Sequence, residues 1–413
     1  MIGEVIAIGD EMTTGARVDT NSAWLSQQLA AVGVRTFFQT TVADDIEAGV
    51  QAFRIAAQRA DIVIATGGLG PTRDDLTREV LAMLMNQPLE FRPEVMEHIQ
   101  TLFSRRGREM PERNRLQAMF PVGADVVPNP QGTAPGLDLT FPREGLPPSR
   151  IFALPGVPAE MKQMVQATVL PRLVASGLAG QRVMRQQVVK CFGVGESEME
   201  SRLGNMIARD RTPSVGITVS RATISLRITA DATDDALALQ QIMETRQQIY
   251  QLVPEFIFGE GEGCELQDAV SDALVHRAES LAVIEAGAAA PLAGWLAGKP
   301  GFRAGIYVPE LNDLEKRKDE PQEEIFARIA SENKVDWLLA VDAYPQLPET
   351  DQPLPAFPLR VLIWKAIPSS ESKGELQVSE LELGGHPDIV QDRIAKAALD
   401  ILRKQLKRKT KDN

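Results

Sequence analysis

The chain has 413 residues, which is enough for two or three domains of ordinary size. Hydrophobic residues make up 44% of the sequence and charged residues 24%, a composition that excludes an intrinsically disordered chain. Having only two cysteines excludes a disulfide framework, and a net charge of −12 argues against a protein built to wrap nucleic acid, because phosphate affinity comes mainly from Lys and Arg.

No apolar run approaches the roughly 20 residues that span a bilayer. The first residues begin directly with a strand pattern and carry neither the basic stretch nor the cleavage site of an export signal. The three histidines lie far apart in the sequence, so no His-rich metal site is expected. We therefore expect a cytoplasmic protein with no membrane partner.

Residues 1–177 alternate strand and helix patterns, which is typical of a parallel sheet covered by helices. Strand patterns at 4–8, 34–42 and 61–65 alternate with helix patterns that begin near residues 20 and 46. Further helix patterns cover 74–86, 92–106 and 111–118, and short strand patterns follow near 124–127 and 151–154. The sequence therefore predicts a three-layer α/β/α domain over residues 1–177.

The pattern changes after this domain. Residues 183–253 follow the order strand, helix, strand, strand, helix, which predicts a small α+β module. Residues 254–264 interleave Glu and Gly and are predicted to be a linker. Residues 265–413 form a second α/β pattern, within which the proline-rich stretch 347–358 is predicted to be irregular.

The strongest functional signal is the run from Thr66 to Thr77, TGGLGPTRDDLT, which directly follows a buried strand pattern. Gly67, Gly68 and Gly70 allow the backbone to bend sharply and to approach a ligand closely. The helix that follows offers unpaired N–H groups and the positive end of its dipole to a phosphate. A tight turn with a helix cap is the plain alternative, but the combination of strand, glycines and paired acids favours a binding loop.

Acidic residues follow the strands of the same predicted sheet. Asp10 ends the first strand pattern, Asp44 and Asp45 end the second, and Asp74 and Asp75 follow the glycine loop. Because the carboxyl ends of parallel strands share one edge, these side chains are expected to face a common crevice. There they would repel one another unless a cation neutralised them, so the sequence predicts a divalent metal beside a phosphate-bearing substrate. The alternative is that Asp10 and Asp45 simply cap helices.

Two more loops rich in Gly and Pro, at 132–136 and 154–158, adjoin strand patterns and are predicted to form a wall of the site. Asn114 and Gln117 lie three apart on a helix pattern and are candidates for reading a base or a ribose edge. Exposed polar residues at that spacing are also common, so this assignment stays open.

In this order, the motifs resemble the signatures of the amino-terminal domain of the CinA (competence/damage-inducible) family, which is similar to the molybdopterin-binding fold. The segments that carry the resemblance are 9–11, 19–22, 67–77, 113–117, 132–136 and 155–161. Residues 192–197, FGVGES, likewise resemble the family's central KH-like module. The resemblance thus implies an α/β protein with a molybdopterin-binding-like domain, a KH-like module and a carboxy-terminal α/β domain like that of CinA.

What the resemblance implies for function is a metal-dependent ADP-ribose pyrophosphatase. A bound cation of unknown identity would polarise the diphosphate and lower the pKa of an attacking water. Asp10, Asp45 and Asp75 are the expected catalytic residues, and Asp10, Asp45 and Asp74 the expected metal ligands. The expected substrate-binding residues are Asn21, Ser22, Gly67, Gly68, Gly70, Thr72, Asn114, Gln117, Gly132, Thr133, Pro155 and Gly156.

In its carboxy-terminal part the chain departs from the family. Relatives with nicotinamide-nucleotide amidase activity carry Glu-Ser-Cys-Thr-Gly-Gly after a strand, with the serine as nucleophile. The corresponding stretch here, residues 285–290, reads EAGAAA and places Ala286 at the nucleophile position. A methyl group cannot attack an amide, and neither Ser271 nor Ser280 lies at the matching position, so we expect a degenerate domain without amidase activity.

Two other interpretations stay open: a pterin- or nucleotide-binding protein, and a non-enzymatic adaptor in competence or the DNA-damage response. KH-like modules can bind single-stranded nucleic acid. Residues 183–253, however, hold eight basic and eight acidic residues and no Gly-x-x-Gly. The expected partners are therefore a nucleotide substrate and a second copy of the chain in a homodimer, with nucleic acid not expected as a direct ligand.

Overall fold

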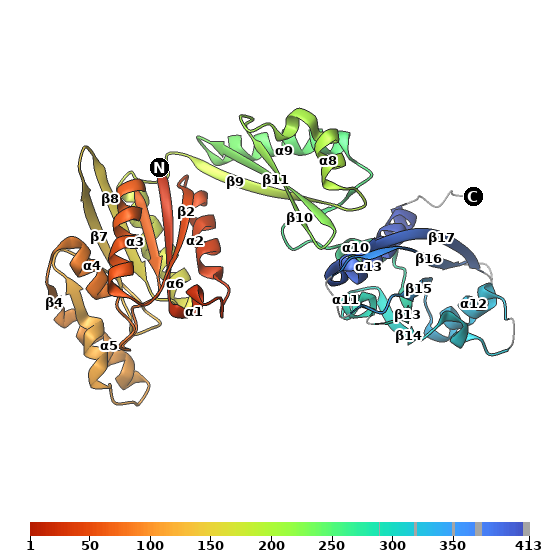
Figure 1. Cartoon of the computed structure of the whole chain (residues 1–413), viewed down its shortest axis with the longest axis horizontal. Helices are drawn as coiled ribbons and strands as arrows, with labels where there is room; N and C mark the ends of the chain where they lie inside the picture. The colour runs from red at the N-terminus through yellow and green to blue at the C-terminus, as the bar shows by residue number, and fades with distance from the viewer. Residues whose placement is uncertain (289, 318–319, 349–351, 368–373, 408–413) are drawn as a thin grey trace. The chain divides into compact units, whose positions relative to one another are not determined.

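The computed structural model of the protein describes residues 1–288, 290–317, 320–348, 352–367 and 374–407 (Figure 1). Contacts group the chain into two compact units, one of residues 1–185 and 230–240 and one of residues 186–229 and 241–413. The predicted α/β class is confirmed. No helix within the described ranges is long and apolar enough to cross a membrane.

The first unit is built on a six-stranded sheet with the order β2-β1-β3-β8-β7-β6. The four strands β2, β1, β3 and β8 pair in parallel, while β7 pairs antiparallel with β8 and with β6. The strands are β1 (Ile2–Ile8), β2 (Arg35–Val42), β3 (Ile62–Thr66), β6 (Asp125–Val127), β7 (Gly136–Arg143) and β8 (Leu146–Leu154). A separate pair is formed by β4 (Leu89–Phe91) and β5 (Met119–Pro121).

Helices cover both faces of this sheet, as Figure 1 shows. Successive residues of β1 demonstrate the layering, because Val5 belongs to one apolar core and Ile6 to another. The core around Val5 contains side chains of α2, α6 and α7, and the core around Ile6 those of α3, α4 and α5. The helical segments are α1 (Asp10–Thr13), α2 (Thr20–Ala31), α3 (Ile46–Arg59), α4 (Thr77–Met85), α5 (Pro93–Arg105), the 3-10 helix η1 (Glu112–Ala118), α6 (Pro158–Met164), the π-helical η2 (Val165–Val169) and α7 (Leu170–Ala175).

The parallel strands bring three loops to one edge of the sheet. Ala7 of β1 is paired with Thr66 of β3, which in turn is paired with Leu154 of β8. The loops that follow these strands therefore begin side by side, at residues 9, 67 and 155. This edge is where the sequence predicts a crevice.

A four-stranded sheet with the order β10-β11-β9-β12 follows. It consists of β9 (Val183–Cys191), β10 (Ser214–Ser220), β11 (Thr223–Ala232) and β12 (Ile257–Glu260), accompanied by α8 (Glu196–Leu203), the 3-10 helix η3 (Gly204–Ile207) and α9 (Asp235–Leu252). The prediction of a linker over 254–264 is wrong for its central part. Ile257 is paired with Cys191 and is buried, so the apolar Ile-Phe pair of this segment completes the sheet.

The carboxy-terminal region contains a five-stranded sheet with the order β14-β13-β15-β16-β17, in which β16 and β17 are antiparallel. Its elements are β13 (Leu281–Gly287), β14 (Phe302–Val308), β15 (Trp337–Tyr344), β16 (Leu354–Ala366), β17 (Gly374–Gly385), α10 (Leu266–Arg277), α11 (Leu292–Leu296), the 3-10 helix η4 (Leu311–Leu314), α12 (Gln322–Asn333) and α13 (Pro387–Lys407). The predicted irregular stretch 347–358 is a strand from Leu354 onward, and residues 349–351 lie outside the described ranges. A bulge between Leu354 and Phe357 accommodates the prolines at the start of this strand.

Within the second unit, the KH-like strands and the carboxy-terminal region share one apolar core. Phe192 and Phe258 belong to the same buried cluster as side chains of α10 and α13. Two buried cations of α13 add polar contacts. Lys396 donates to the Thr223 hydroxyl (2.7 Å), and Arg403 donates to the Ile257 carbonyl (2.8 Å). The sequence predicts separate domains over 183–253 and 265–413. The shared core explains why contacts group these two regions into one unit.

Candidate functional site

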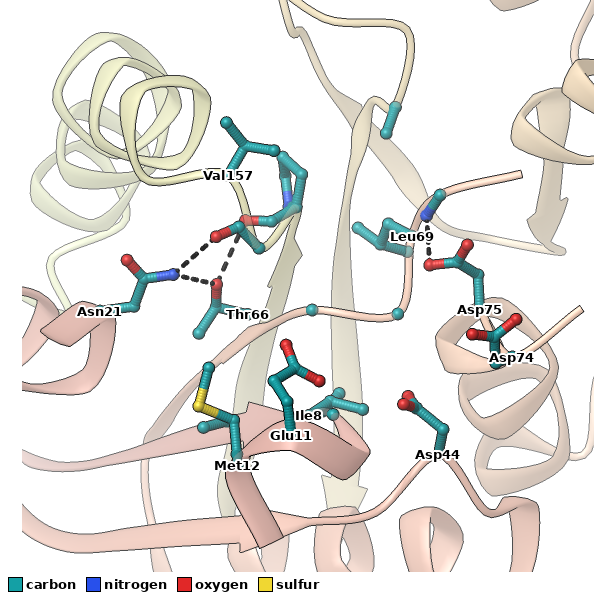
Figure 2. A pocket seen from close by; sticks show the side chains of 18 of the residues that line it. Ile8, Glu11, Met12, Asn21, Asp44, Thr66, Leu69, Asp74, Asp75 and Val157 are labelled. Carbon is teal, nitrogen blue, oxygen red and sulfur yellow. Dashed lines mark hydrogen bonds between the residues drawn. The ribbon is translucent and has the colours of Figure 1, made fainter. Parts of the chain in front are cut away.

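A cavity of about 610 Å³ lies at the edge where β1, β3 and β8 end. Its size is within the range of small-molecule binding sites. The lining comes from the loops after these three strands and from the starts of the following helices (Figure 2). Of the residues predicted from the sequence, those that line it are Asn21, Gly67, Gly68, Gly70, Asp74, Asp75, Gln117, Thr133, Pro155 and Gly156.

The glycine loop forms the wall that is best suited to phosphate. Gly67 has φ +117°, and a Cβ there would lie 2.2 Å from the Ile8 carbonyl oxygen, so the loop can pass β1 only with glycine. Within the described part of the chain, the N–H groups of Gly68 and Leu69 donate to no protein acceptor. Two free backbone donors in a cavity wall are what a phosphate-binding loop requires.

Side chains behind the loop fix its shape. Asp75 accepts hydrogen bonds from the N–H groups of Gly70 (2.7 Å) and Thr72 (2.8 Å) and from the Thr72 hydroxyl. Arg78 donates to the carbonyls of Leu69 (2.5 Å) and Gly70 (3.3 Å), and the Thr77 hydroxyl donates to the Gly67 carbonyl (3.0 Å). The loop is therefore held by side chains that contact its backbone, a preorganised arrangement.

Asn114 and Gln117 contribute to the same support. Gln117 donates to the Leu69 carbonyl (3.4 Å), and Asn114 donates to the Gln117 side-chain oxygen (2.9 Å). Both residues are buried, and of the two only Gln117 lines the cavity. The prediction that they read a base edge is replaced for Asn114 by a supporting role, because its amide contacts Gln117 and lies behind it.

The carboxylates are arranged around Asp44. In Figure 2, Glu11, Asp44 and Asp74 lie below and beside the glycine loop. Burial raises the pKa of Asp44 above its ordinary value of 3.8, the Asp10 N–H lowers it, and the charges of Asp10, Glu11 and Asp74 raise it further. Burial and neighbouring negative charges thus both disfavour the ionised carboxylate, and a cation beside it would favour that form.

Two predicted metal ligands, Asp10 and Asp45, do not line the cavity. Asp45 is the N-cap of α3 and accepts from the Ala48 N–H (2.9 Å), which is the alternative role that the sequence left open. Asp10 exchanges hydrogen bonds with Asp44: its carboxylate accepts from the Asp44 N–H (3.2 Å), and its own N–H donates to the Asp44 carboxylate (3.1 Å). Asp10 thus holds Asp44 in place from outside the cavity.

Asp75 lines the cavity, and its predicted catalytic role stays a prediction. Both of its oxygens accept hydrogen bonds from the glycine loop, so its charge is used to shape that loop. Thr72, predicted to bind substrate, is the partner of Asp75 and does not line the cavity. The predicted helix over 74–86 begins only at Thr77, because Asp74 and Asp75 lie in the turn before α4.

Another part of the cavity lining holds a network of uncharged polar groups. Asn21 donates to the Thr66 hydroxyl (3.2 Å) and to the Gly156 carbonyl (2.9 Å), and Thr66 donates to the Pro155 carbonyl (3.2 Å). This network ties the start of α2 to the loop after β8. Ser22, the neighbour of Asn21, is buried and its side chain does not line the cavity.

The loop at 132–136 closes one side. Gly132 donates its N–H to the Asn129 side chain (2.9 Å), which itself donates to Glu160 (2.7 Å). A Cβ on Gly132 would lie 2.0 Å from a Glu160 oxygen, so a larger residue would displace the Glu160 side chain. Gly132 therefore supports the wall, and its neighbour Thr133 lines it.

Several lining residues are not among the expected catalytic, metal-binding or substrate-binding residues, although the sequence predicts that Asp44 faces the crevice. Glu11, Asp44 and Glu160 line the cavity, and Arg17 is the single basic side chain among the described lining residues. Asp44 and Glu11 each lie next to a predicted acid, and nothing in the sequence tells which of two neighbouring acids faces inward. Arg17 lies in the turn between α1 and α2, where no periodic pattern marks it.

The residues that the structure describes contain no group of three or more His, Cys, Asp or Glu side chains that could hold a metal ion by themselves. Mg²⁺ is usually held by one or two carboxylates, with phosphate oxygens and waters completing its shell. Asp44, with Glu11 or Asp74 near it, provides that kind of donor set.

The predicted nucleophile position of the carboxy-terminal region is buried. Ala286 is fully buried in β13, and its methyl group belongs to an apolar core. The preceding Glu285 accepts from the N–H groups of Leu292 (2.8 Å) and Ala293 (2.9 Å), at the start of α11. Ala289 of the corresponding segment lies outside the described residues.

Comparison with known proteins places this architecture in a family. A family model described as a probable molybdopterin binding domain matches residues 4–175, and the model of the KH domain of damage-inducible protein CinA matches residues 186–259. A CinA-like protein of Picosynechococcus sp. is 40% identical over 286 residues, which are 69% of this chain and 67% of that protein. The chain belongs to the CinA-like protein family. A CinA-like protein of Dictyoglomus thermophilum, 32% identical, aligns over 98% of both chains.

Among solved structures, the CinA protein of unknown function from Thermoplasma acidophilum is 32% identical over 41% of this chain and 96% of its own, with a TM-score of 0.37. MoaB of Thermus thermophilus is 21% identical over 42% of this chain and 92% of its own, with a TM-score of 0.29. The family models confirm the predicted membership in the CinA-like family. The KH model ends at residue 259, within β12, in agreement with the strand found in the predicted linker.

Proposed function

We propose that the amino-terminal unit of this CinA-like protein hydrolyses a nucleoside diphosphate ester of the ADP-ribose type with the help of a divalent cation. The observation that carries the proposal is the juxtaposition, in one cavity, of two free backbone N–H groups and a cluster of carboxylates around Asp44. In this proposal the N–H groups bind phosphate oxygens, and the carboxylates bind a cation. A diphosphate that carries its own cation meets both kinds of group.

The charge of the cavity supports a cation as the necessary companion. Six acidic side chains and only Arg17 among basic ones line it in the described part of the chain. A diphosphate alone would be repelled from such a wall. The acidic lining residues are Glu11, Asp19, Asp44, Asp74, Asp75 and Glu160.

In this proposal, Gly68 and Leu69 donate their N–H groups to the diphosphate and stabilise the charge that develops on it. Asp44 would hold the cation, with Glu11 or Asp74, while Asp10 keeps the Asp44 backbone and carboxylate in place. A bound cation would supply Lewis-acid polarisation of the diphosphate and a lower pKa for the attacking water. Water adds across the P–O–P bridge, and AMP and ribose 5-phosphate are released.

The part of the cavity beside Asn21 and Thr66 is the proposed place of the nucleoside. Val157 and Met12 provide apolar surface there, next to the Asn21–Thr66 network, as Figure 2 shows. An uncharged ring system can pack against these apolar side chains. The proposed substrate class therefore combines an uncharged ring with a diphosphate.

The test is an assay of AMP release from ADP-ribose with Mg²⁺ or Mn²⁺, using Asp44→Asn and Asp45→Asn as a matched pair. Asp44→Asn is expected to lower the rate by about 100-fold or more, because it removes a ligand of the cation. Asp45→Asn is expected to retain the rate within about twofold, since Asn also caps helices well. Chelation of the cation is expected to abolish the reaction.

Two outcomes would contradict the proposal. AMP release that persists in a chelator would remove the cation from the mechanism. A larger loss in Asp45→Asn than in Asp44→Asn would restore the assignment made from the sequence.

For the carboxy-terminal region we propose that nicotinamide-nucleotide amidase activity is lost. The support is the buried methyl group of Ala286 at the nucleophile position. Ammonia release from nicotinamide mononucleotide, followed beside the AMP assay, tests this proposal, and any enzyme-dependent release would contradict it.

A second candidate function is binding of a phosphorylated pterin without hydrolysis. It is favoured by the match of residues 4–175 to a probable molybdopterin binding domain. Tight binding of a phosphorylated pterin by a protein that releases no AMP from ADP-ribose with any cation would establish it.

A further inference from the structure

Arg78 is a buried cation directly behind the glycine loop. It is 2% exposed, and burial lowers the pKa of its guanidinium to about 10, so it remains charged at neutral pH. Among the described residues it forms no ion pair with a carboxylate. Its partners are the carbonyl oxygens of Leu69 (2.5 Å) and Gly70 (3.3 Å).

A charge in this position is costly, because transfer of a guanidinium from water is repaid only by strong hydrogen bonds. The aliphatic part of the side chain packs as an apolar residue would, and it needs no charge to do so. The role of the charge is therefore to be found in the two loop carbonyls that it contacts.

One peptide group connects Arg78 to an opposite charge. The peptide between Leu69 and Gly70 accepts from Arg78 through its carbonyl (2.5 Å) and donates through its N–H to Asp75 (2.7 Å). A cation and an anion thus bind opposite ends of the same peptide dipole. Each charged partner strengthens the hydrogen bond of the other, since a polarised peptide is both a better acceptor and a better donor.

This arrangement determines which loop groups stay free for a ligand. With the Leu69 and Gly70 carbonyls turned toward Arg78 and the Gly70 N–H turned toward Asp75, the N–H groups of Gly68 and Leu69 are left without acceptors in the described part of the chain. Glycine is the residue type that fits at position 70, because a Cβ there would lie 2.4 Å from an Asp75 oxygen.

We propose that Arg78 is a positioning residue, which acts through the Leu69–Gly70 peptide and Asp75 to hold the Gly68 and Leu69 N–H groups ready for a phosphate. The phosphate role rests on the proposed function. The effect on the loop does not, and it is measurable without any ligand.

The binding test uses isothermal titration of the full chain with inorganic pyrophosphate and Mg²⁺. Arg78→Met is expected to weaken binding by at least about tenfold. Arg78→Lys is expected to recover part of the loss, because an ammonium keeps the charge but lacks the planar set of donors of a guanidinium. The matched control is Arg143→Met. The side chain of Arg143 is only 5% exposed, and it contacts the carbonyls of Ala60 (3.2 Å) and Pro147 (2.5 Å) at the other end of the strands. Unlike Arg78, it also forms an ion pair, with Asp61 (2.9 Å). Its variant is expected to bind as the wild type does.

Coupling between the two charges is tested by the double variant. If Arg78 and Asp75 act through one peptide, Arg78→Met combined with Asp75→Asn weakens pyrophosphate binding by clearly less than the product of the two single effects. Multiplicative effects would overturn the proposed connection, as would equal losses in Arg78→Met and Arg143→Met.

The ligand-free test is hydrogen exchange of the Gly70 and Thr72 amides, which donate to Asp75. Exchange in Arg78→Met is expected to be at least about tenfold faster than in the wild type and in Arg143→Met, because the amides open more readily once the loop carbonyls lose their donor. Unchanged exchange would overturn the proposal even if binding were lost. If the wild type binds no pyrophosphate with any cation, the proposed function fails, and the exchange result alone decides the role of Arg78.

Discussion

Asp44 and Asp45 are neighbours in the sequence, yet the structure gives them different surroundings. Asp44 is half-buried in the cavity wall among other carboxylates, whereas Asp45 caps α3 and does not line the cavity. A sequence shows that two acids follow a strand, but not which of them turns toward the sheet edge. Which side chain faces the cavity depends on the residue at which α3 starts. If the helix started one residue earlier, the two acids would exchange their roles.

The raised pKa of Asp44 predicts how Asp44→Asn changes stability. Because the pKa of the folded form lies above 3.8, the ionised carboxylate weakens the folded state, and this loss develops as the pH rises from about 3.8 through the folded pKa. Asp44→Asn is therefore expected to have a higher Tm than the wild type at about pH 7, with the difference vanishing near pH 3. Thermal unfolding monitored by circular dichroism measures both values.

Asp45→Asn is the control for that experiment, because it removes an equal charge and keeps a capping side chain. Its Tm is expected to follow that of the wild type at each pH. A stabilisation by Asp45→Asn equal to that by Asp44→Asn would mean that general charge repulsion, and not the burial of Asp44 beside the other carboxylates of the cavity, raises the pKa of Asp44.

At the scale of elements, the glycine loop was the most predictable part of the site. A buried strand followed by Thr66–Thr77 indicates a sharp turn at the sheet edge, and the loop after β3 is found there. The supporting contacts were not predictable, since Arg78 and Gln117 come from α4 and η1, whose placement against the loop depends on tertiary packing. Sequence periodicity alone does not report such contacts.

The loop makes a specific prediction for Gly67→Ala. Its φ of +117° and the 2.2 Å approach to the Ile8 carbonyl exclude a Cβ without displacement of β1 or β3. We expect a loss of about 1–3 kcal/mol from backbone strain alone. Chemical denaturation measures the free energy of unfolding, and Gly107→Ala is a suitable control, because Gly107 also has positive φ but has nothing within 4 Å of the position that a Cβ would occupy. Equal losses in the two variants would show that the approach to Ile8 is unimportant.

Two segments differ from the secondary structure that the sequence predicts. The helix pattern over 111–118 forms a 3-10 helix, and residues 254–264 contain β12. The Glu and Gly residues of this segment suggested a linker, but Ile257 and Phe258 between them are buried. Two apolar residues are too few to produce a periodic signal, although they suffice to complete a sheet.

At the scale of the whole chain, three α/β and α+β regions were predicted, and the structure contains three corresponding sheets. Their grouping into two compact units was not predictable, because it depends on the core that Phe192 and Phe258 share with α13 and on the buried Lys396 and Arg403. The homodimer and the absence of nucleic acid among the partners stay predictions, which light scattering and a nucleic-acid binding assay measure.

The function proposed for the protein depends on one claim, that the cavity holds a diphosphate on the glycine loop and its cation on Asp44. The most direct measurement is a crystal structure with Mn²⁺ and a methylene analogue of ADP-ribose that resists hydrolysis, with the cation located by anomalous scattering. We predict an anomalous peak at the Asp44 carboxylate and the analogue's phosphates on the Gly68 and Leu69 N–H groups. A peak at Asp45, or phosphates bound away from residues 67–70, would contradict this claim.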